Sequence, residues 1–321
     1  MRKCFRPVIF SFTLAVVIFS FGCSKDQKLY KGMEDIFREK KLEMAKLKAN
    51  YKPGAAEDVR VPEGSAADYE KLGDAYLEEG RIGLAFVNYN KAAALMPGDP
   101  EINYKIGRLL LKKGAVDEAR AIFEEIIKEG KKPALGHEGL GRAFFRKGDL
   151  ARAEENFEAA LKSGAAGWEI RNFLGMVCDR KGQFADAARH YEAAIAENPG
   201  QHVLFNNLGI SLYRSGDYGR AAEMFEKALD LNPQTKIYNN LALTLARLGR
   251  YAEALQVFTS VSNEWSALNN LGLIYLMEGK YRQAEDAFQR AAEKSPVYFE
   301  KAVENLKKAR TRVGPYRSPK V

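Results

Sequence analysis

Residues 206–233 read NNLGISLYRSGDYGRAAEMFEKALDLNP, and the spacing of a few residues in this stretch decides the fold. A Leu-Gly pair ends at Gly209, seven residues before Gly216, and Gly216 is followed by Ala221 and Phe225. A glycine between two apolar segments of helical period ends the first helix in a left-handed conformation that only glycine adopts without strain. The stretch therefore predicts a hairpin of two helices with its turn at Gly216.

The same pattern recurs along most of the chain. The glycines that mark the predicted turns, 30 to 34 residues apart, are Gly80, Gly114, Gly148, Gly182, Gly216, Gly249 and Gly279. Nine residues after each of them stands an aromatic residue: Tyr89, Phe123, Phe157, Tyr191, Phe225, Phe258 or Phe288. Because one hairpin cannot bury its apolar faces alone, the units are expected to stack into a solenoid with a shared core.

These columns resemble the motif of the tetratricopeptide repeat family, which has Leu-Gly in the first helix, Gly at the turn, Ala and an aromatic residue in the second helix, and Pro at the end. The resemblance covers residues 66–298 and predicts an all-α fold, a right-handed solenoid of seven helical hairpins with a C-terminal capping helix. We expect small residues to face small ones where the two helices of a hairpin cross, while aliphatic and aromatic residues fill the seam on either side.

Two features near the end of the array carry separate predictions. The sixth repeat is four residues short, so its second helix is expected to end near Val261. After the seventh repeat, an apolar stripe of helical spacing comprises Ala302, Val303, Leu306 and Ala309. A solenoid needs a terminal element that covers its last apolar surface. Residues 299–321 are therefore predicted to be this capping helix and a basic tail.

The amino terminus has the layout of an export signal. Residues 1–22 combine a basic start with the apolar run 7–21, which is shorter than the ~20 residues that a membrane-spanning helix needs. Gly22-Cys23 at the end of the run resembles the lipobox of bacterial lipoproteins. The resemblance implies that residues 1–22 are removed, that Cys23 carries the lipid, and that the protein lies on the periplasmic face of the outer membrane. An uncleaved anchor and ordinary secretion are the alternatives.

A charged spacer and a connector, residues 23–65, separate this signal from the repeats. Five apolar residues lie a helical turn or two apart in an otherwise charged stretch: Leu29, Met33, Ile36, Met44 and Leu47. They predict a helix over residues 26–49, followed by a flexible connector rich in Pro and Gly. This helix has three possible roles, as a spacer, as a partner for the first repeat or as an oligomerisation element, and we favour the spacer.

Several classes of function are not expected from this sequence. The net charge is +8, but the basic excess lies at the two ends of the chain, so we predict no nucleic-acid binding. Once the signal is removed and the lipid attached, Cys178 is the one remaining thiol, and His137, His190 and His202 lack metal-site spacing. No glycine cluster has the form of a phosphate-binding loop. We therefore predict no enzyme activity, no cofactor, no metal and no small-molecule substrate.

The resemblance also implies where a partner would bind. In this family the concave groove is lined mainly by first helices, at positions that flank the Leu-Gly pair. The candidate groove residues are Tyr104, Arg108, Arg142, Asn172, Asn206, Tyr213, Asn239 and Asn269. An asparagine side chain both donates and accepts, so a row of asparagines suits a bound peptide or helix. Bonds between neighbouring helices are an equally good explanation of this row.

The overall plan is similar to that of assembly lipoproteins of Flp/Tad pili and of the pilotins of type IV pili. It implies a non-enzymatic, protein-binding scaffold, lipid-anchored at the outer membrane, that assists assembly of a Flp/Tad-type pilus or secretion machine. Its expected partners are secretin or pilus assembly subunits and, through the lipid anchor, the membrane. The alternative is an adaptor for envelope polysaccharide export or for cell-wall enzymes.

Overall fold

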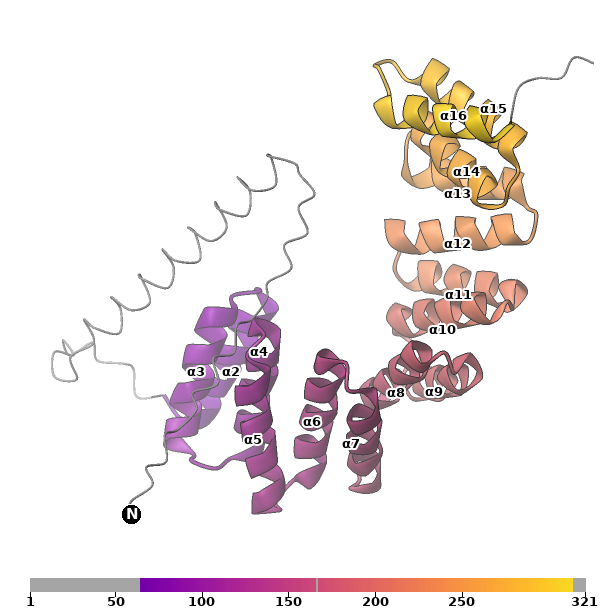
Figure 1. Ribbon diagram of the computed structural model, residues 1–321. Coiled ribbons are helices and arrows are strands. Elements are labelled where there is room, and N and C mark those ends of the chain that lie inside the picture. The colour runs from indigo at the N-terminus through magenta and orange to yellow at the C-terminus, as the bar shows by residue number, and fades with distance from the viewer. Residues whose placement is uncertain (1–63, 166, 314–321) are drawn as a thin grey trace, which may run out of the picture. The chain divides into compact units, whose positions relative to one another are not determined.

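Fifteen helices and no strand make up the part of the chain that the computed structural model describes, residues 64–165 and 167–313 (Figure 1). Their bounds are Ala66–Glu78 (α2), Ile82–Leu95 (α3), Pro100–Lys113 (α4), Val116–Glu129 (α5), Pro133–Lys147 (α6), Leu150–Lys162 (α7), Trp168–Lys181 (α8), Phe184–Glu197 (α9), His202–Ser215 (α10), Tyr218–Leu231 (α11), Thr235–Arg247 (α12), Tyr251–Val261 (α13), Glu264–Met277 (α14), Tyr281–Lys294 (α15) and Glu300–Val313 (α16). The predicted signal, Cys23, the helix over 26–49 and the basic tail lie outside the described residues.

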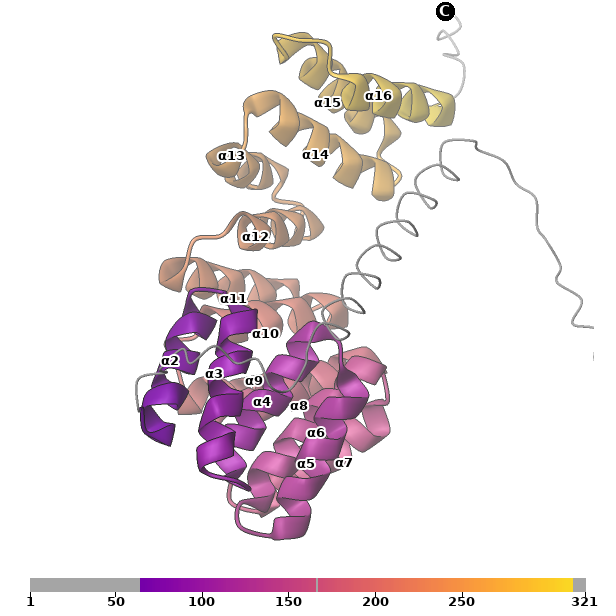
Figure 2. The same ribbon diagram turned by 90° about the vertical axis from the view of Figure 1, so that its left-hand side faces the viewer.

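The helices pair into seven hairpins, from α2 with α3 to α14 with α15, and α16 follows as a single helix (Figures 1 and 2). Each second helix also packs on the first helix of the next hairpin. In addition, the first helices α4, α6, α8, α10 and α12 contact one another in succession, as do α14 and α16. The first helices therefore share one face of the array, and the all-α solenoid predicted from the sequence is confirmed.

The spaced glycines form the turns that the sequence predicted. All seven have positive φ angles: Gly80 74°, Gly114 84°, Gly148 79°, Gly182 77°, Gly216 91°, Gly249 78° and Gly279 73°. At Gly216 the left-handed residue caps α10, and its backbone N–H donates to the carbonyls of Leu212 and Tyr213. A side chain at such a φ would clash with the following carbonyl oxygen, which explains why glycine stands at each turn.

The prediction that small residues face small ones inside a hairpin is wrong. The glycine of each Leu-Gly pair instead faces the aromatic ring of the second helix in its own repeat. A Cβ atom on Gly175 would lie 2.5 Å from Cε1 of Tyr191, and one on Gly209 would lie 2.8 Å from Cε1 of Phe225. The aromatic ring fills the crossing, so the first helix has glycine at this position in six repeats and the small residue Ala242 in the sixth.

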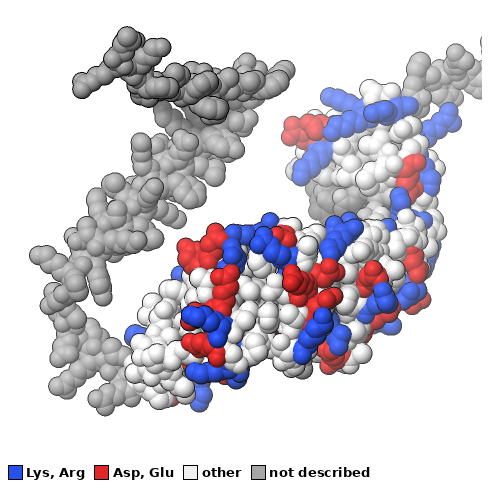
Figure 3. Space-filling view, turned by 60° about the horizontal axis from the view of Figure 1, so that its bottom comes forward, with Lys and Arg blue, Asp and Glu red and all other residues white. Residues whose placement is uncertain are grey.

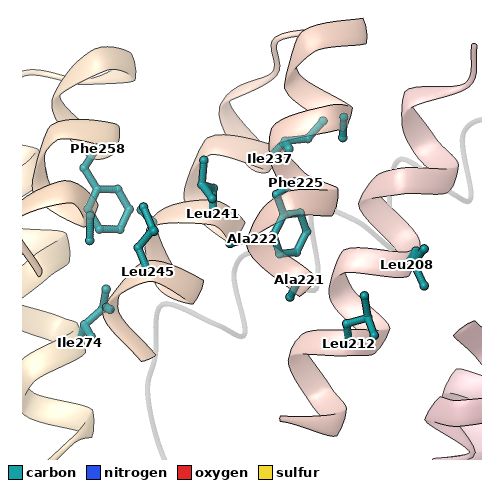
Figure 4. Packing of buried hydrophobic residues seen from close by; sticks show 14 of the residues in the cluster. Leu208, Leu212, Ala221, Ala222, Phe225, Ile237, Leu241, Leu245, Phe258 and Ile274 are labelled. Atoms are coloured by element: carbon teal, nitrogen blue, oxygen red, sulfur yellow. The ribbon is translucent and has the colours of Figure 1, made fainter. Parts of the chain in front are cut away.

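The hydrophobic core runs from one repeat into the next. One continuous cluster extends from Cys178 in α8 to Ile274 in α14, and Figure 4 shows the part from Leu208 onward. There the ring of Phe225 lies between Leu208 and Leu212 of the preceding helix α10 and Ile237 of the following helix α12. Packing on both sides of each second helix buries its ring, and Phe225 is only 1% exposed. Stacking thus supplies the burial that a lone hairpin lacks.

The two predictions about the end of the array are confirmed. Helix α13 of the short sixth repeat ends at Val261, and α14 begins three residues later at Glu264. The side chain of Asn263 caps α14 by accepting a hydrogen bond from the backbone N–H of Ser266 at 2.9 Å. Helix α16 packs on α15 and fully buries Ala302 and Ala309, so it covers the last apolar surface.

Candidate protein-binding site

An open pocket of about 250 Å³ lies on the face shared by the first helices. Helices α4, α6 and α8 supply its walls: Arg108, Leu111, Lys112, Arg142, Phe145, Arg146 and Phe173. We call this the α4–α6–α8 pocket. Two residues predicted from the sequence, Arg108 and Arg142, are brought together there.

The apolar part of the pocket is built from aromatic rings that support one another. The ring centroids of Phe145 and Phe173 lie 5.6 Å apart at an interplanar angle of 78°, an edge-to-face contact. Behind them Phe157, the fully buried aromatic residue of the third repeat, stacks on Phe173 at 5.2 Å. Edge-to-face and offset pairs are favoured arrangements of aromatic rings, so this wall is rigid before any partner arrives.

Arg142 is held in place by Glu138, whose side chain is only 13% exposed. Its Nε donates to Oε1 of Glu138 at 2.9 Å, and the hydroxyl of Tyr104 donates to the same oxygen at 2.6 Å. Burial raises the pKa of Tyr104, so its hydroxyl keeps the proton that this bond needs. The guanidinium of Arg142 also lies 4.5 Å from the centroid of the Phe173 ring. Arg142 is thus a fixed wall of the pocket, and Tyr104 lies beneath the surface instead of facing a partner.

Three further cations in the pocket have no carboxylate partner among the described residues. Arg108, Lys112 and Arg146 are all exposed, and none of them forms an ion pair there. On the face that Figure 3 shows, by contrast, basic and acidic groups alternate. Ion pairs such as Arg220 with Glu192 at 2.8 Å neutralise each other. The pocket therefore carries uncompensated positive charge beside an aromatic wall.

The asparagine row is used within the protein. Three side-chain bonds join neighbouring first helices: Asn207 Nδ2 to Asn172 Oδ1 at 2.9 Å, Asn240 Nδ2 to Asn206 Oδ1 at 3.1 Å, and Asn305 Nδ2 to Asn269 Oδ1 at 3.1 Å. Two of the acceptors, Asn206 and Asn269, are 7% and 6% exposed. The amide groups of this row therefore stabilise the stacking of repeats, which is the second of the two explanations that the sequence left open.

The other two predicted groove residues lie apart from the pocket. Asn239 is exposed on α12 and has no hydrogen-bonded side-chain partner in the described part of the chain. Tyr213 on α10 is half-buried, its ring centroid 5.3 Å from that of Tyr218, and burial raises its pKa. Both residues belong to later repeats, so they form no common site with Arg108 and Arg142.

Sequence reasoning missed five residues of the pocket: Leu111, Lys112, Phe145, Arg146 and Phe173. A signal for the basic members was present, because the residue two places before the spaced glycine is Lys112, Arg146, Arg180, Arg214 and Arg247 in successive repeats. Later members of this column bond back to the preceding repeat. Arg180 Nη1 donates to the carbonyl of Phe145 at 3.1 Å, and Arg214 Nη1 donates to that of Asp179 at 3.3 Å. Lys112 and Arg146, which form no such bond, face the pocket.

Burial shifts the pKa values of two reactive side chains, Cys178 and His190. Burial raises the pKa of the Cys178 thiol to about 11, so the thiolate is scarce at neutral pH. Burial and two neighbouring arginines lower the pKa of His190. No cluster of His, Cys, Asp or Glu in the described chain is suited to a metal ion. In the same residues no helix is long and apolar enough to cross a bilayer.

Comparison with solved structures finds the same fold in proteins of low sequence identity. The C-terminal part of a tetratricopeptide repeat protein from Cytophaga hutchinsonii is 19% identical, with a TM-score of 0.54 over 74% of this chain and 98% of that part. PilW, a type IV pilus biogenesis factor, is 21% identical, with a TM-score of 0.50 over 64% of this chain and 98% of that one. The Cut9–Hcn1 complex of the APC/C gives 19%, a TM-score of 0.51 and 76% coverage, and the chain spans about half of that longer protein, 52%.

No curated protein matches the sequence. Models described as tetratricopeptide repeat match residues 76–143, residues 139–202 and 206–262, and residues 265–296. Together these matches span most of the seven hairpins. The chain belongs to the tetratricopeptide repeat family.

Proposed function

We propose that this protein is a non-enzymatic scaffold that holds a partner protein by an acidic segment bound in the α4–α6–α8 pocket. The observation that carries the proposal is the set of three unpaired cations, Arg108, Lys112 and Arg146, beside the wall of Phe145 and Phe173. Guanidinium groups bind carboxylates through paired, charge-assisted hydrogen bonds, and aromatic walls bind apolar side chains. The fitting segment therefore carries at least one carboxylate next to an apolar or aromatic side chain.

The strength of this interaction depends on salt. Because the three cations are exposed, each contact with a carboxylate is screened by solvent and contributes modestly on its own. The aromatic wall adds a contribution that salt does not weaken. Partner binding is thus expected to fall, without disappearing, as the ionic strength rises.

We further propose that the scaffold is lipid-anchored through Cys23 at the periplasmic face of the outer membrane and assists assembly of a Flp/Tad-type pilus or secretion machine. Its support is the sequence plan of signal, Cys23, charged spacer and repeat array, which resembles that of the pilus assembly protein TadD. The fold shared with PilW, described as a type IV pilus biogenesis factor, agrees with this role. The proposed partners are secretin or pilus assembly subunits.

The pocket is tested by charge reversal with a matched control. Arg108→Glu with Arg146→Glu changes the net charge by the same amount as Lys227→Glu with Lys308→Glu, two exposed residues outside the pocket. Envelope proteins that co-purify with the wild type are expected to be lost from the first variant and retained by the second. Helicity measured by circular dichroism should be equal in all three. Retention of every partner by the pocket variant would show that the pocket is not the binding site.

The wider role is tested in cells of the source bacterium that lack the gene. If the proposal is correct, secretin multimers and surface pili decrease, and the wild-type gene restores both. Unchanged multimers and pili, together with co-purified polysaccharide-export or cell-wall enzymes, would instead favour the alternative of an envelope adaptor. The result for the pocket is independent of this outcome, because the pocket experiment measures binding alone.

A further inference from the structure

A row of basic side chains continues from the α4–α6–α8 pocket into the fifth and sixth repeats. In the second to sixth repeats the residue two places before the turn glycine is basic and exposed, and the row comprises Lys112, Arg146, Arg180, Arg214 and Arg247. The first repeat has Glu78 at this position and the seventh has Met277, so the row has two defined ends. We call these five residues the basic row. Its first two members line the pocket, and the other three extend beyond it.

Hydrogen bonds place successive members of the basic row side by side. Nη1 of Arg180 donates at 3.1 Å to the carbonyl of Phe145, the residue just before Arg146. Nη1 of Arg214 donates in the same way, at 3.3 Å, to the carbonyl of Asp179, the residue just before Arg180. The first helices that carry these residues also contact one another in succession. The row is therefore continuous along the array.

The arginines of the row are held in place without being neutralised. Besides the two bonds to carbonyls, Arg247 donates to the hydroxyl of Tyr218 at 2.9 Å. The guanidinium groups of Arg180, Arg214 and Arg247 lie 3.9, 4.8 and 5.3 Å from the centroids of neighbouring aromatic rings. No member of the row forms an ion pair with a carboxylate of the described residues. A guanidinium has five N–H donors, so each arginine keeps donors for a further acceptor.

The carboxylates beside the row are used by other groups. Asp179 is almost fully buried and accepts the hydroxyl of Tyr191 at 2.8 Å. Glu278, near the far end of the row, pairs with Lys280 at 3.0 Å. The basic row therefore presents an excess of fixed positive charge, which suits a ligand with several negative charges.

The spacing of the row distinguishes between conformations of a bound chain. Packed helices lie ~8–10 Å apart, so neighbouring cations are expected at about that separation. Side chains on one face of a polyproline II helix repeat every ~9.3 Å, which is three residues at ~3.1 Å each. The corresponding distances are ~6.6 Å for two residues of a β-strand and ~5.4 Å for one turn of an α-helix. Polyproline II thus matches the row with one carboxylate for each cation.

An α-helix with acidic residues seven apart would repeat every ~10.5 Å and would also come close to this spacing. A helix that docks on a protein surface, however, needs an apolar stripe on that surface. Beyond the pocket, guanidinium groups of the row lie over the neighbouring rings, the first of them Arg180 over Phe145. The row therefore offers charge without an apolar stripe, which favours the extended conformation.

We propose that the basic row binds an acidic segment of the partner protein in the polyproline II conformation, with Asp or Glu at every third residue. Four steps of ~8–10 Å span roughly 32–40 Å, which corresponds to about ten to thirteen residues of such a segment. The aromatic wall of the pocket takes an apolar side chain at one end. This inference rests on the proposed protein-binding function and adds the length, spacing and conformation of the bound segment.

Three fluorescent peptides test the spacing on the full-length protein in a neutral detergent. Each begins with phenylalanine and carries five glutamates: a proline-rich peptide with glutamate at every third residue, the same residues in shuffled order, and an alanine-rich helix with glutamate at every seventh residue. Fluorescence anisotropy at low salt is expected to show that the first peptide binds ~5–10-fold more tightly than the shuffled one, because exposed ion pairs contribute modestly and several are lost together. Equal affinity for these two would overturn the proposal. Tighter binding of the helix, or of polygalacturonate as an acidic polysaccharide, would also overturn it.

Charge removal outside the pocket tests the row itself. Arg180→Gln with Arg214→Gln is compared with Arg189→Gln and Arg220→Gln, which remove two exposed arginines from the second helices of the same repeats. The row variant is expected to bind the first peptide ~5–10-fold more weakly, and the control to bind it like the wild type. Arg180→Lys with Arg214→Lys keeps the charges and should retain most of the affinity even if the glutamine variant folds poorly by circular dichroism. Loss of affinity in the lysine variant equal to that in the glutamine variant would contradict a role for charge.

A short peptide separates this inference from the pocket. Phenylalanine followed by two glutamates is long enough for the pocket alone, so it is expected to bind the row variant and the wild type equally. If the short peptide binds and the long peptide binds no more tightly, the pocket is a binding site and the basic row is not. If neither peptide binds, the pocket and the row both fail as binding sites.

Discussion

Gly209 and Gly219 lie ten residues apart in one hairpin, but their surroundings differ. A Cβ atom on Gly209 would lie 2.8 Å from Cε1 of Phe225, whereas one on Gly219 would meet no atom within 4 Å. Gly209→Ala is therefore expected to lower the free energy of unfolding by ~1–3 kcal/mol through overpacking. Gly219→Ala, in the first turn of α11, is expected to leave it unchanged or raise it by up to ~1 kcal/mol. Urea denaturation of both variants measures the difference, and equal shifts would contradict the close approach of the two helices.

The two tyrosines of the aromatic column have a second role that phenylalanine cannot take. The hydroxyl of Tyr191 donates to Oδ2 of Asp179 at 2.8 Å, and that carboxylate is almost fully buried. The hydroxyl of Tyr89 donates to Asp74 at 2.7 Å, but Asp74 is more exposed and also receives Lys105 at 2.7 Å. The carboxylate of Asp179 therefore depends on the Tyr191 hydroxyl for a hydrogen bond much more than the carboxylate of Asp74 depends on the Tyr89 hydroxyl.

This difference predicts unequal effects of one and the same substitution. Tyr191→Phe leaves the buried carboxylate without its donor and should lower the free energy of unfolding by ~1–3 kcal/mol, while Tyr89→Phe should cost less than ~1 kcal/mol. Both variants keep the aromatic ring, and phenylalanine is the natural residue at this position in other repeats. Chemical denaturation followed by circular dichroism gives both values. A larger loss for Tyr89→Phe would show that the buried acid is satisfied in another way.

At the scale of helices, the sequence predicted what depends on spacing within one repeat and missed what depends on contacts between repeats. The glycine turns, the early end of α13 at Val261 and the capping helix α16 follow from local pattern. The hydrogen-bond partner of an asparagine side chain does not follow from local pattern. Asn172, for example, accepts from Asn207, thirty-five residues later, because of how one first helix lies against the next.

The pocket was only partly predicted for the same reason. Arg108 and Arg142 stand beside Leu-Gly pairs and were found by the family pattern, but Arg146 and Phe173 enter the site through the relative placement of α6 and α8. The prediction of what the glycines of the Leu-Gly pairs face was also wrong, because they meet aromatic rings and not small residues. A 34-residue period states which residues are equivalent, whereas the rotation between neighbouring helices decides which of them meet.

Helix α16 stabilises the array by covering the seventh repeat. Ala309 is fully buried and belongs to the same core cluster as Phe288, whereas the adjacent Lys308 is exposed. Ala309→Glu would place a charge in this contact and is expected to lower the free energy of unfolding by ~1–3 kcal/mol. Lys308→Glu, the matched control, should change it by less than ~0.5 kcal/mol. Hydrogen exchange of α15 should rise in the first variant alone. Equal protection of α15 in both variants would show that α16 is not a cap.

For the molecule as a whole, the two proposals assign attachment and recognition to different parts of the chain. Most asparagines of the first helices join repeat to repeat, whereas the exposed cations of the α4–α6–α8 pocket have no carboxylate partner in the described part of the chain and can meet a partner. The proposed anchor, Cys23, lies far from it in sequence. Substitution of Cys23 is therefore expected to leave partner binding unchanged, and substitution in the pocket is expected to leave membrane attachment unchanged.

Cys23→Ala makes this separation measurable. The variant should lose label from a fatty-acid precursor and leave the membrane fraction, because more than one acyl chain is needed for stable anchoring and each buried methylene contributes ~0.8 kcal/mol. Purified, it should bind the same partners as the wild type, since its pocket is unchanged, whereas Arg108→Glu with Arg146→Glu should remain in the membrane and lose them. Pilus or secretin assembly in cells should fail in both variants, because assembly at the outer membrane needs binding and position together. Wild-type protein that carries no label and still begins at Met1 would exclude the lipid anchor. A purified Cys23→Ala variant that fails to bind the partners would show that attachment and recognition are not independent.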